Sequence, residues 1–350
     1  MRSLHDKIEQ LLKLKTPFVA YRKPLGNRVN LLVQQDDELH YLESYEQKGF
    51  VFAPFDDQKK IILFSLDKCK LTSFSYDLKN NIISKKEIKE KYLPEEQSKR
   101  NHIELVTKGI ELIKKGKVKK VVLSRKEEVS FGEILKSELF SRLIYLYPLA
   151  FVSICFHPKV GLWIGATPET LLSVNGKIFK TMSLAGTQQF NGNKQVEWAA
   201  KEREEQEIVT DFILEQLKNF DLNISDPFTK KAGDLLHICT EITGELKSND
   251  RLESLIHKLH PTPAVCGFPK EVAKSFILQN ENYDREFYTG FLGELNLNNM
   301  TDLYVNLRCM QINGKKASLF IGGGITIDSD PEKEWEETVS KTSVMKRVLV

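Results

Sequence analysis

Cysteine is scarce in this chain, and no two cysteines have the spacing of a zinc or redox motif. The 350 residues include five cysteines, scattered from position 69 to position 309, and none forms a Cys-x-x-Cys pair. An odd and dispersed set argues for free thiols in a reducing compartment and against a zinc site. We therefore expect a cytoplasmic protein without disulfide bonds.

Long apolar runs and a large charge of one sign are also missing. The first residues lack the apolar stretch of a secretion signal, and the longest apolar stretches are too short to span a membrane. The net charge of +3 is too small to favour nucleic acid or an anionic membrane as the main partner. The hydrophobic content of 41% and the charged content of 28% are those of a soluble globular protein. We expect a monomer that acts on a small molecule.

The most informative stretch lies near the end of the chain. Three glycines at 322–324 follow an apolar strand, a polar residue at 328–330 can cap a helix, and Pro331 suits the first turn of that helix. Glycines after a strand let backbone N–H groups approach an anion. Glu334 and Glu337 share one helix face. Taken alone, the pattern also fits a surface helix with acidic residues near its positive end.

A second pair of carboxylates has the same spacing. Glu202 and Glu205 lie three positions apart on a helix predicted for residues 195–220, the longest that the sequence indicates. The many charges around them make a solvated face the simpler interpretation. If this helix faced the one that carries Glu334 and Glu337, the four carboxylates would form an oxygen-ligand site suited to Mg²⁺.

Four other polar residues lie on or beside predicted strands. Lys120 is in an apolar strand at 118–125, which is usual at a sheet edge but also fits a desolvated amine able to act as a base. Glu169 follows a proline in a tight turn, where a capping role is the simpler interpretation. His237 lies in an apolar strand, where a structural histidine is common. Arg308, on another apolar strand, needs an anion or a buried carboxylate partner.

The beginning of the chain has a different texture. Residues 16–80 contain short β-rich segments separated by Gly, Pro, Asn and Asp, which predict an antiparallel sheet. This region shows no chemical motif. We expect one domain over residues 1–350, with an N-terminal sheet portion at 1–90 and a catalytic core at 91–350.

Seven short motifs follow one another in the core. They are Lys-Val-Val-Leu-Ser-Arg at 120–125, Thr-Pro-Glu at 167–169, Leu-Ala-Gly-Thr at 184–187, Leu-His-Pro-Thr-Pro-Ala at 259–264, Tyr-Thr-Gly at 288–290, Gly-Gly-Gly-Ile at 322–325 and Glu-Trp-Glu-Glu at 334–337. Their order and spacing resemble the chorismate-utilising enzymes, which include anthranilate, aminodeoxychorismate, isochorismate and salicylate synthases. The resemblance covers about residues 118–347. It implies an α+β fold of two large, mostly antiparallel β-sheets packed together, with helices on the outside.

One position separates the members of this family. A lysine at the start of the strand, here Lys120, resembles isochorismate and salicylate synthases, in which it activates water. Anthranilate synthases typically carry glutamine there. Aminodeoxychorismate synthases carry a nucleophilic lysine where this chain has Ala185. The resemblance thus implies Mg²⁺-dependent conversion of chorismate to isochorismate, for menaquinone or siderophore biosynthesis. The alternative is a salicylate synthase, which also eliminates pyruvate.

The resemblance also implies roles for individual residues. Lys120 would deprotonate water for attack at C2, and Glu169 would protonate the departing C4 hydroxyl. Mg²⁺ would bridge the ring carboxylate to two glutamates while two others hold its waters. The remaining residues would bind the substrate's carboxylates or orient its ring. The four metal-site residues would be Glu205 and Glu337, with Glu202 and Glu334 for the waters; the substrate-binding residues would be Gly186, Thr187, His237, Tyr288, Arg308, Gly322, Gly324 and Lys341.

Overall fold

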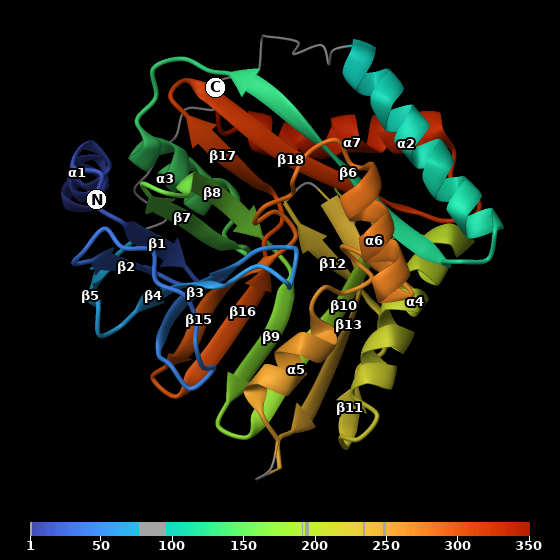
Figure 1. The fold of residues 1–350 in the computed structure, drawn as a ribbon, viewed down its shortest axis with the longest axis horizontal. Helices are drawn as coiled ribbons and strands as arrows, with labels where there is room; N and C mark the ends of the chain where they lie inside the picture. Colours follow the sequence, from blue (N-terminus) through green and yellow to red (C-terminus); the bar gives the residue numbers. More distant parts are fainter. Residues whose placement is uncertain (1, 77–95, 191, 193–195, 234, 248–249) are drawn as a thin grey trace.

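The protein folds into two packed β-sheets with helices on their outer faces (Figure 1). The computed structural model describes residues 2–76, 96–190, 192, 196–233, 235–247 and 250–350. A core of aromatic and aliphatic side chains, including Tyr21, Phe50 and Trp163, joins strands of the two sheets. The α+β architecture with two large antiparallel sheets is confirmed. Within the described ranges, no helix has the length and apolar character needed to cross a membrane.

Sheet 1 has nine strands, and neighbouring strands are antiparallel. Its longest pairing joins β6 and β18 over ten residue pairs, from Lys316–Ser130 to Ile325–Val121. In spatial order the strands are β14 (Gly267–Phe268), β6 (Lys120–Ser130), β18 (Lys316–Ile325), β17 (Cys309–Asn313), β8 (Gly161–Thr167), β7 (Phe151–His157), β1 (Phe18–Arg22), β2 (Arg28–Gln34) and β5 (Cys69–Ser75).

Sheet 2 also has nine strands, one of which, β12 (Phe228–Ala232), pairs with β13 beside the main path. The pairing of β10 with β13 shifts register between Ala185 and Gln188, so a β-bulge interrupts the strand there. The order is β11 (Leu222–Ile224), β13 (Leu235–Glu245), β10 (Ile178–Gln189), β9 (Thr170–Asn175), β16 (Met300–Val305), β15 (Phe291–Leu297), β3 (Gly49–Ala53) and β4 (Ile62–Ser65).

The sequence predicts that the N-terminal strands form an antiparallel sheet of their own, but they do not. β1, β2 and β5 extend sheet 1 beyond β7, whereas β3 and β4 extend sheet 2 beyond β15. Local periodicity predicts that these segments are strands but not which distant strand each one joins. The expected boundary near residue 90 lies outside the described residues.

Helices cover the outer faces of both sheets. α1 and α3 pack on sheet 1, α2 and α6 pack on β6, and α4 and α5 pack on sheet 2. The last helix, α7, packs beside α2 and β18 (Figure 1). Their bounds are α1 (Arg2–Lys13), α2 (Glu96–Lys114), α3 (Lys136–Leu146), α4 (Ala200–Gln216), α5 (Leu252–Leu259), α6 (Lys270–Asn280) and α7 (Pro331–Lys346).

The two helices that carry the paired glutamates begin close to the sheets. Asp330 caps α7 by accepting hydrogen bonds from the backbone N–H groups of Glu332 and Lys333, as the sequence indicated. α4 begins at Ala200, five residues later than predicted. It is shorter than α2, although the sequence indicates it as the longest helix. Gly186, at the bulge of β10, has a φ of +70° and lies against the first turn of α4. The chain thereby brings both acidic helices to one end of the sheets.

Candidate active site

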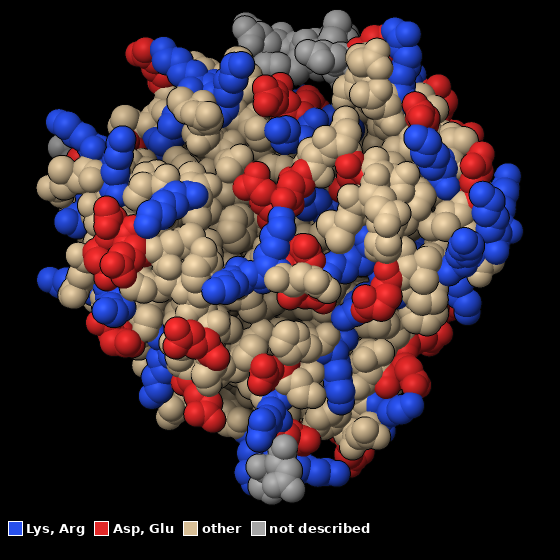
Figure 2. Space-filling model, viewed as in Figure 1, with Lys and Arg blue, Asp and Glu red and all other residues tan. Residues whose placement is uncertain are grey.

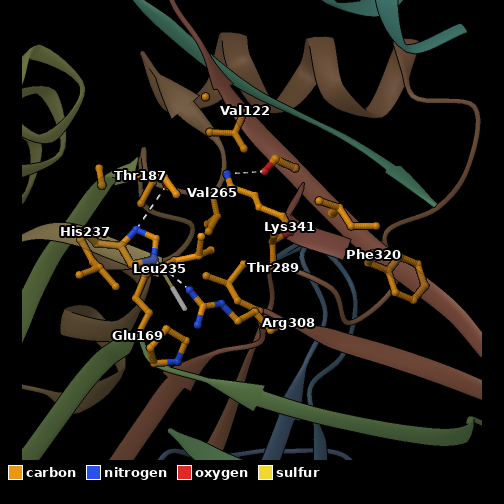
Figure 3. Close-up of a pocket in the computed structure, with 18 of the residues that line it drawn as sticks. Val122, Glu169, Thr187, Leu235, His237, Val265, Thr289, Arg308, Phe320 and Lys341 are labelled. Atoms are coloured by element: carbon orange, nitrogen blue, oxygen red, sulfur yellow. Dashed lines mark hydrogen bonds between the residues drawn. The ribbon is translucent and has the colours of Figure 1, made fainter. Parts of the chain in front are cut away.

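A cavity of about 120 Å³ lies where residues of both sheets meet α4 and α7 (Figure 3). This volume is several times what one water molecule needs, so the cavity can hold a small organic ligand. Apolar residues such as Val122 and Phe320 form part of its wall. Ten of the residues singled out from the sequence also line it, namely Glu169, Gly186, Thr187, Glu205, His237, Tyr288, Arg308, Gly322, Gly324 and Lys341.

Lys120 is the first residue of β6 and is fully buried. Its Nζ atom lies 3.0 Å from Oε1 of Glu205, which lines the cavity from α4. The neighbouring strand leaves room for this ion pair because Gly324 has no side chain at this point. The absence of a Cβ on β18 is therefore what allows an amine of sheet 1 to meet a carboxylate of α4.

Glu169 lies between the end of β8 and the start of β9 and is almost fully buried. Burial raises the pKa of Glu169 to about 7, although the positive charges of Lys120, Lys230 and Arg308 partly offset this effect. The carboxyl group is therefore partly protonated near neutral pH. A glutamate in this state can deliver a proton to a ligand in the cavity.

Arg308 and His237 point toward each other in Figure 3. Nη2 of Arg308 donates a hydrogen bond to Nε2 of His237 at 2.9 Å, and Nη1 donates to the carbonyl oxygen of Ala232 at 2.8 Å. Because Nε2 accepts, Nδ1 carries the proton and donates to the carbonyl oxygen of Gly186 at 2.8 Å. Burial, together with the charge of Arg308, lowers the pKa of His237 to about 3, so the ring is neutral.

Arg308 is not in a strand, contrary to the prediction. It lies in the turn between β16 and β17 with a φ of +48°. This left-handed conformation is unusual for a residue with a side chain. Burial lowers the pKa of Arg308 to about 10, with Tyr147 and Glu169 opposing the shift, so the guanidinium stays charged at neutral pH. The turn therefore presents a buried cation to the cavity.

Two glycines of β18 expose their backbone amides. The N–H group of Ser124, opposite Gly322, donates to Glu281, and the N–H group of Val122, opposite Gly324, donates to Cys266. These are therefore non-hydrogen-bonded pairs, in which the N–H and C=O groups of both partners point away from each other. Lys341 confirms this orientation, since its Nζ atom donates to the carbonyl oxygen of Gly322 at 3.1 Å. The two glycine N–H groups thus face away from β6, where an anion can accept from them.

Tyr288 forms another part of the wall. Its ring stacks on Phe320 with a centroid separation of 5.6 Å. A Cβ on Gly322 would stand 3.0 Å from the Tyr288 hydroxyl oxygen, so the glycine lets this hydroxyl approach the strand. Thr187 completes the polar wall, with Oγ1 3.4 Å from Nδ1 of His237.

Carboxylates of α4 and α7 are paired with lysines. Lys201 Nζ lies 2.7 Å from Oε1 of Glu334, and Lys341 Nζ lies 2.6 Å from Oε1 of Glu337. Burial and the charge of Glu337 raise the pKa of Glu334, although Lys201 opposes them. Burial alone would raise the pKa of Glu337, but the charge of Lys341 more than compensates and lowers it. Together with the Lys120–Glu205 pair, each of these three carboxylates has its own lysine.

The four glutamates have the oxygen ligands of a magnesium site, although three of them are paired with lysines. Among the described residues, no three His, Cys, Asp or Glu side chains converge closely enough to hold a metal ion as they stand. However, the four glutamates supply only oxygen ligands, which Mg²⁺ prefers. Oε2 of Glu202 is also buried, and within the described part of the chain it has no hydrogen-bond partner. These residue types fit a hard divalent cation.

Sequence reasoning missed two features of the site. Lys201 looked like one more charge on a solvated helix, and only the fold shows that it pairs with Glu334. A buried ion pair between Arg285 and Glu281, with Nη2 2.6 Å from Oε1, lies behind the cavity wall. Arg285 also donates to the carbonyl oxygens of Val122 and Val265, and both of these residues line the cavity. Glu281 and Arg285 lie beyond the end of α6, so no helical spacing in the sequence indicated this pair.

Known proteins resemble this chain in sequence and in fold. It is 32% identical over 261 residues to the isochorismate synthase EntC of Escherichia coli K12, and 31% identical over 260 residues to the anthranilate synthase component 1 of Thermococcus kodakarensis. These alignments cover 70% and 71% of this chain but only 66% and 59% of the relatives' own lengths.

A solved structure matches nearly the whole chain. It is described as a proposed 2,3-dihydroxybenzoate-specific isochorismate synthase, DhbC, from Bacillus anthracis, and it superposes with a TM-score of 0.80 at 26% identity over 99% of both chains. The family model described as chorismate binding enzyme matches residues 51–350, which extends further toward the N-terminus than the motifs do. The chain therefore belongs to the family of chorismate-binding enzymes.

Proposed function

We propose that this protein is an isochorismate synthase, which converts chorismate to isochorismate by adding water at C2 and releasing the C4 hydroxyl. The observation that carries the proposal is the placement of Lys120 and Glu169. Glu169 lines the cavity, whereas Lys120 is buried behind its wall, 3.0 Å from Glu205, which lines it; the charge of Lys120 acts on Glu169. The similarity to EntC supports the same activity, but the comparable similarity to an anthranilate synthase makes the residues themselves decisive.

In this proposal Lys120 acts as the base and Glu169 as the acid. Lys120 takes a proton from water as its oxygen attacks C2, the ring double bond shifts, and the C4 hydroxyl leaves as water with the proton of Glu169. One water enters and one leaves, so the reaction is an isomerisation. Nζ of Lys120 is paired with Glu205 in the structure, so in this proposal Glu205 turns to another partner before the amine takes the proton.

The two carboxylates of chorismate would meet two different cationic or amide-rich surfaces. Arg308 and Tyr288 would bind the enolpyruvyl carboxylate, because a guanidinium matches the geometry of a carboxylate. The outward-facing N–H groups of Gly322 and Gly324, with Lys341, would bind the ring carboxylate side. The neutral His237 would hold Arg308 in place through the 2.9 Å hydrogen bond.

Mg²⁺ would be held by Glu205 and Glu337, with Glu202 and Glu334 binding its waters. When bound, a divalent cation would concentrate positive charge beside the ring carboxylate and fix its orientation. The glutamates' part is to offer oxygen ligands; Glu205 would do so from the wall of the cavity, and Glu202, Glu334 and Glu337 from outside its lining. Gly186 contributes by letting the first turn of α4 approach β10.

The decisive experiment is a product analysis. The purified protein is incubated with chorismate and Mg²⁺, and the products are identified by mass spectrometry and NMR. Isochorismate alone would support the proposal. Salicylate with pyruvate would assign the protein to the salicylate synthases, anthranilate after ammonium addition would assign it to the amine-transferring branch, and unchanged chorismate would refute an enzymatic role.

A further inference from the structure

Lys201 neutralises a carboxylate that could hardly exist alone. Glu334 is 2% exposed, and its Oε1 pairs with the Lys201 ammonium at 2.7 Å. Among the described residues, none donates a hydrogen bond of normal geometry to its buried Oε2. A buried carboxylate without a cation is strongly unfavourable. The site therefore contains a cation of its own before any metal arrives.

The ammonium of Lys201 also lies within the field of the other acids. Besides its 2.7 Å ion pair with Glu334, this ammonium interacts electrostatically with Glu337 and Glu205. These are three of the four carboxylates that would hold Mg²⁺. The positive charge of Lys201 therefore acts on the same groups as a divalent cation would.

Of the three lysines in the acidic site, Lys201 is the easiest to displace. Its side chain is 34% exposed, compared with 0% for Lys120 and 23% for Lys341. Lys341 is also anchored by a hydrogen bond to the carbonyl oxygen of Gly322. Lys201 is the second residue of α4, so rotation of its flexible side chain can carry the ammonium into water.

Electrostatic repulsion favours an exchange. The ammonium of Lys201 lies 2.7 Å from Oε1 of Glu334, so a divalent cation that binds through this carboxylate has a positive charge next to it. Because like charges repel strongly in a poorly solvated site, departure of the Lys201 ammonium relieves this repulsion.

We propose that Lys201 is the internal counter-ion of the metal-free site and that a divalent cation displaces it into solvent on binding. This inference rests on the proposed metal site, and it assigns to Lys201 a positioning role that lowers the apparent metal affinity. In the metal-free protein Lys201 holds Glu334 in place through the 2.7 Å ion pair. In the metal-bound protein it no longer touches Glu334.

The first test measures Mg²⁺ binding by isothermal titration calorimetry without substrate. Lys201→Gln should bind Mg²⁺ about tenfold more tightly than the wild type, the effect of losing roughly 1.4 kcal/mol of competition. Arg203→Gln is the matched control, because it removes the same charge from an exposed position on the same helix turn. Equal affinities in the two variants, or weaker binding by Lys201→Gln, would overturn the inference.

The second test reads the side chain itself in the wild type. Mild acetylation followed by peptide mass spectrometry reports the reactivity of each lysine, and saturating Mg²⁺ should raise the labelling rate of Lys201 several-fold. Lys218, exposed near the end of the same helix, should not change and serves as the internal control. Unchanged or slower labelling of Lys201 would contradict displacement. If neither the wild type nor Lys201→Gln binds Mg²⁺, the metal site itself is wrong; if both bind it equally, only the role of Lys201 is wrong.

Discussion

Gly324 lies directly against Glu205: a Cβ built on this glycine would overlap Oε1 of the carboxylate and stand 2.9 Å from Cε of Lys120. The backbone conformation at Gly324 is one that other residues also adopt. The lack of room for a side chain, and not the backbone conformation, therefore explains the glycine. The glycine in β18 thus leaves room for the Lys120–Glu205 ion pair. The first prediction follows from this close contact.

Gly324→Ala should lower kcat by about a hundredfold, because displacing a reacting group by an ångström can cost that much. The added methyl group has to push aside either Glu205 or Lys120. Steady-state kinetics with chorismate and Mg²⁺ provide the measurement. Gly132→Ala is the control, since a Cβ there meets nothing within 4 Å. Full activity of Gly324→Ala would mean that the pair is not part of the working site.

Lys120→Gln should reduce kcat by about 10²- to 10⁴-fold, the usual contribution of a general base. The glutamine keeps a polar group of similar size but cannot take a proton from water. The affinity for chorismate, measured by equilibrium titration in the presence of Mg²⁺, should change much less than kcat. Turnover close to that of the wild type would remove Lys120 from the base role.

The activity should fall as the pH rises through about 7, because Glu169 must be protonated to act as the acid. This limb is expected in the pH profile of kcat/KM, which reports on the free enzyme. Lys230→Gln should move the limb to higher pH, since the charge of Lys230 lowers the pKa of Glu169. Lys231→Gln removes the next charge along the strand and should leave the limb in place. If Lys230→Gln leaves the limb at the same pH, a group other than Glu169 is responsible for it.

Glu169→Gln should be nearly inactive yet more stable than the wild type at alkaline pH. The folded state raises the pKa of Glu169 from 4.5 to about 7, so the cost of the buried charge grows between these values and is complete above them. At pH 8 the variant should gain stability on the order of 3 kcal/mol, whereas at pH 5 it should gain little. Urea denaturation at both pH values tests this. An equal gain at both would exclude a charge-based cause.

Glu205→Gln and Glu337→Gln should each abolish the response of activity to Mg²⁺ and weaken Mg²⁺ binding in calorimetry. Removal of divalent cations with EDTA should inactivate the wild type, and added Mg²⁺ should restore it. Glu336→Gln is the matched control, because Glu336 is exposed and adjacent on the same helix. A normal Mg²⁺ response in either site variant would place the metal elsewhere.

Much of the site could be predicted from local pattern. The glycine triplet, the capped helix at Pro331 and the two glutamate pairs follow from turn chemistry and helix geometry, both of which act over a few residues. Lys120 was also recognisable as the start of a strand. The resemblance to the chorismate-utilising family then predicts that these segments contribute to one site.

The missing parts depend on long-range contacts. Arg308 looked like a strand residue because the apolar alternation continues through the turn in which it lies. The partners of Lys201 and Lys120 are on other elements, so no spacing in the sequence could identify them. The same is true of β5, which the sequence did not indicate, and whose mostly exposed residues lack a clear alternation.

The division of the N-terminal strands between the two sheets has a consequence for biosynthesis. Phe52 of β3 pairs with Leu292 of β15, and these positions are 240 residues apart. At typical translation speeds the ribosome needs roughly 10 to 50 s to make the intervening chain. During that interval β3 has β4 beside it, but its other edge has no partner until β15 is made. An open edge of an apolar strand favours aggregation, so the nascent polypeptide has to be shielded until β15 has emerged.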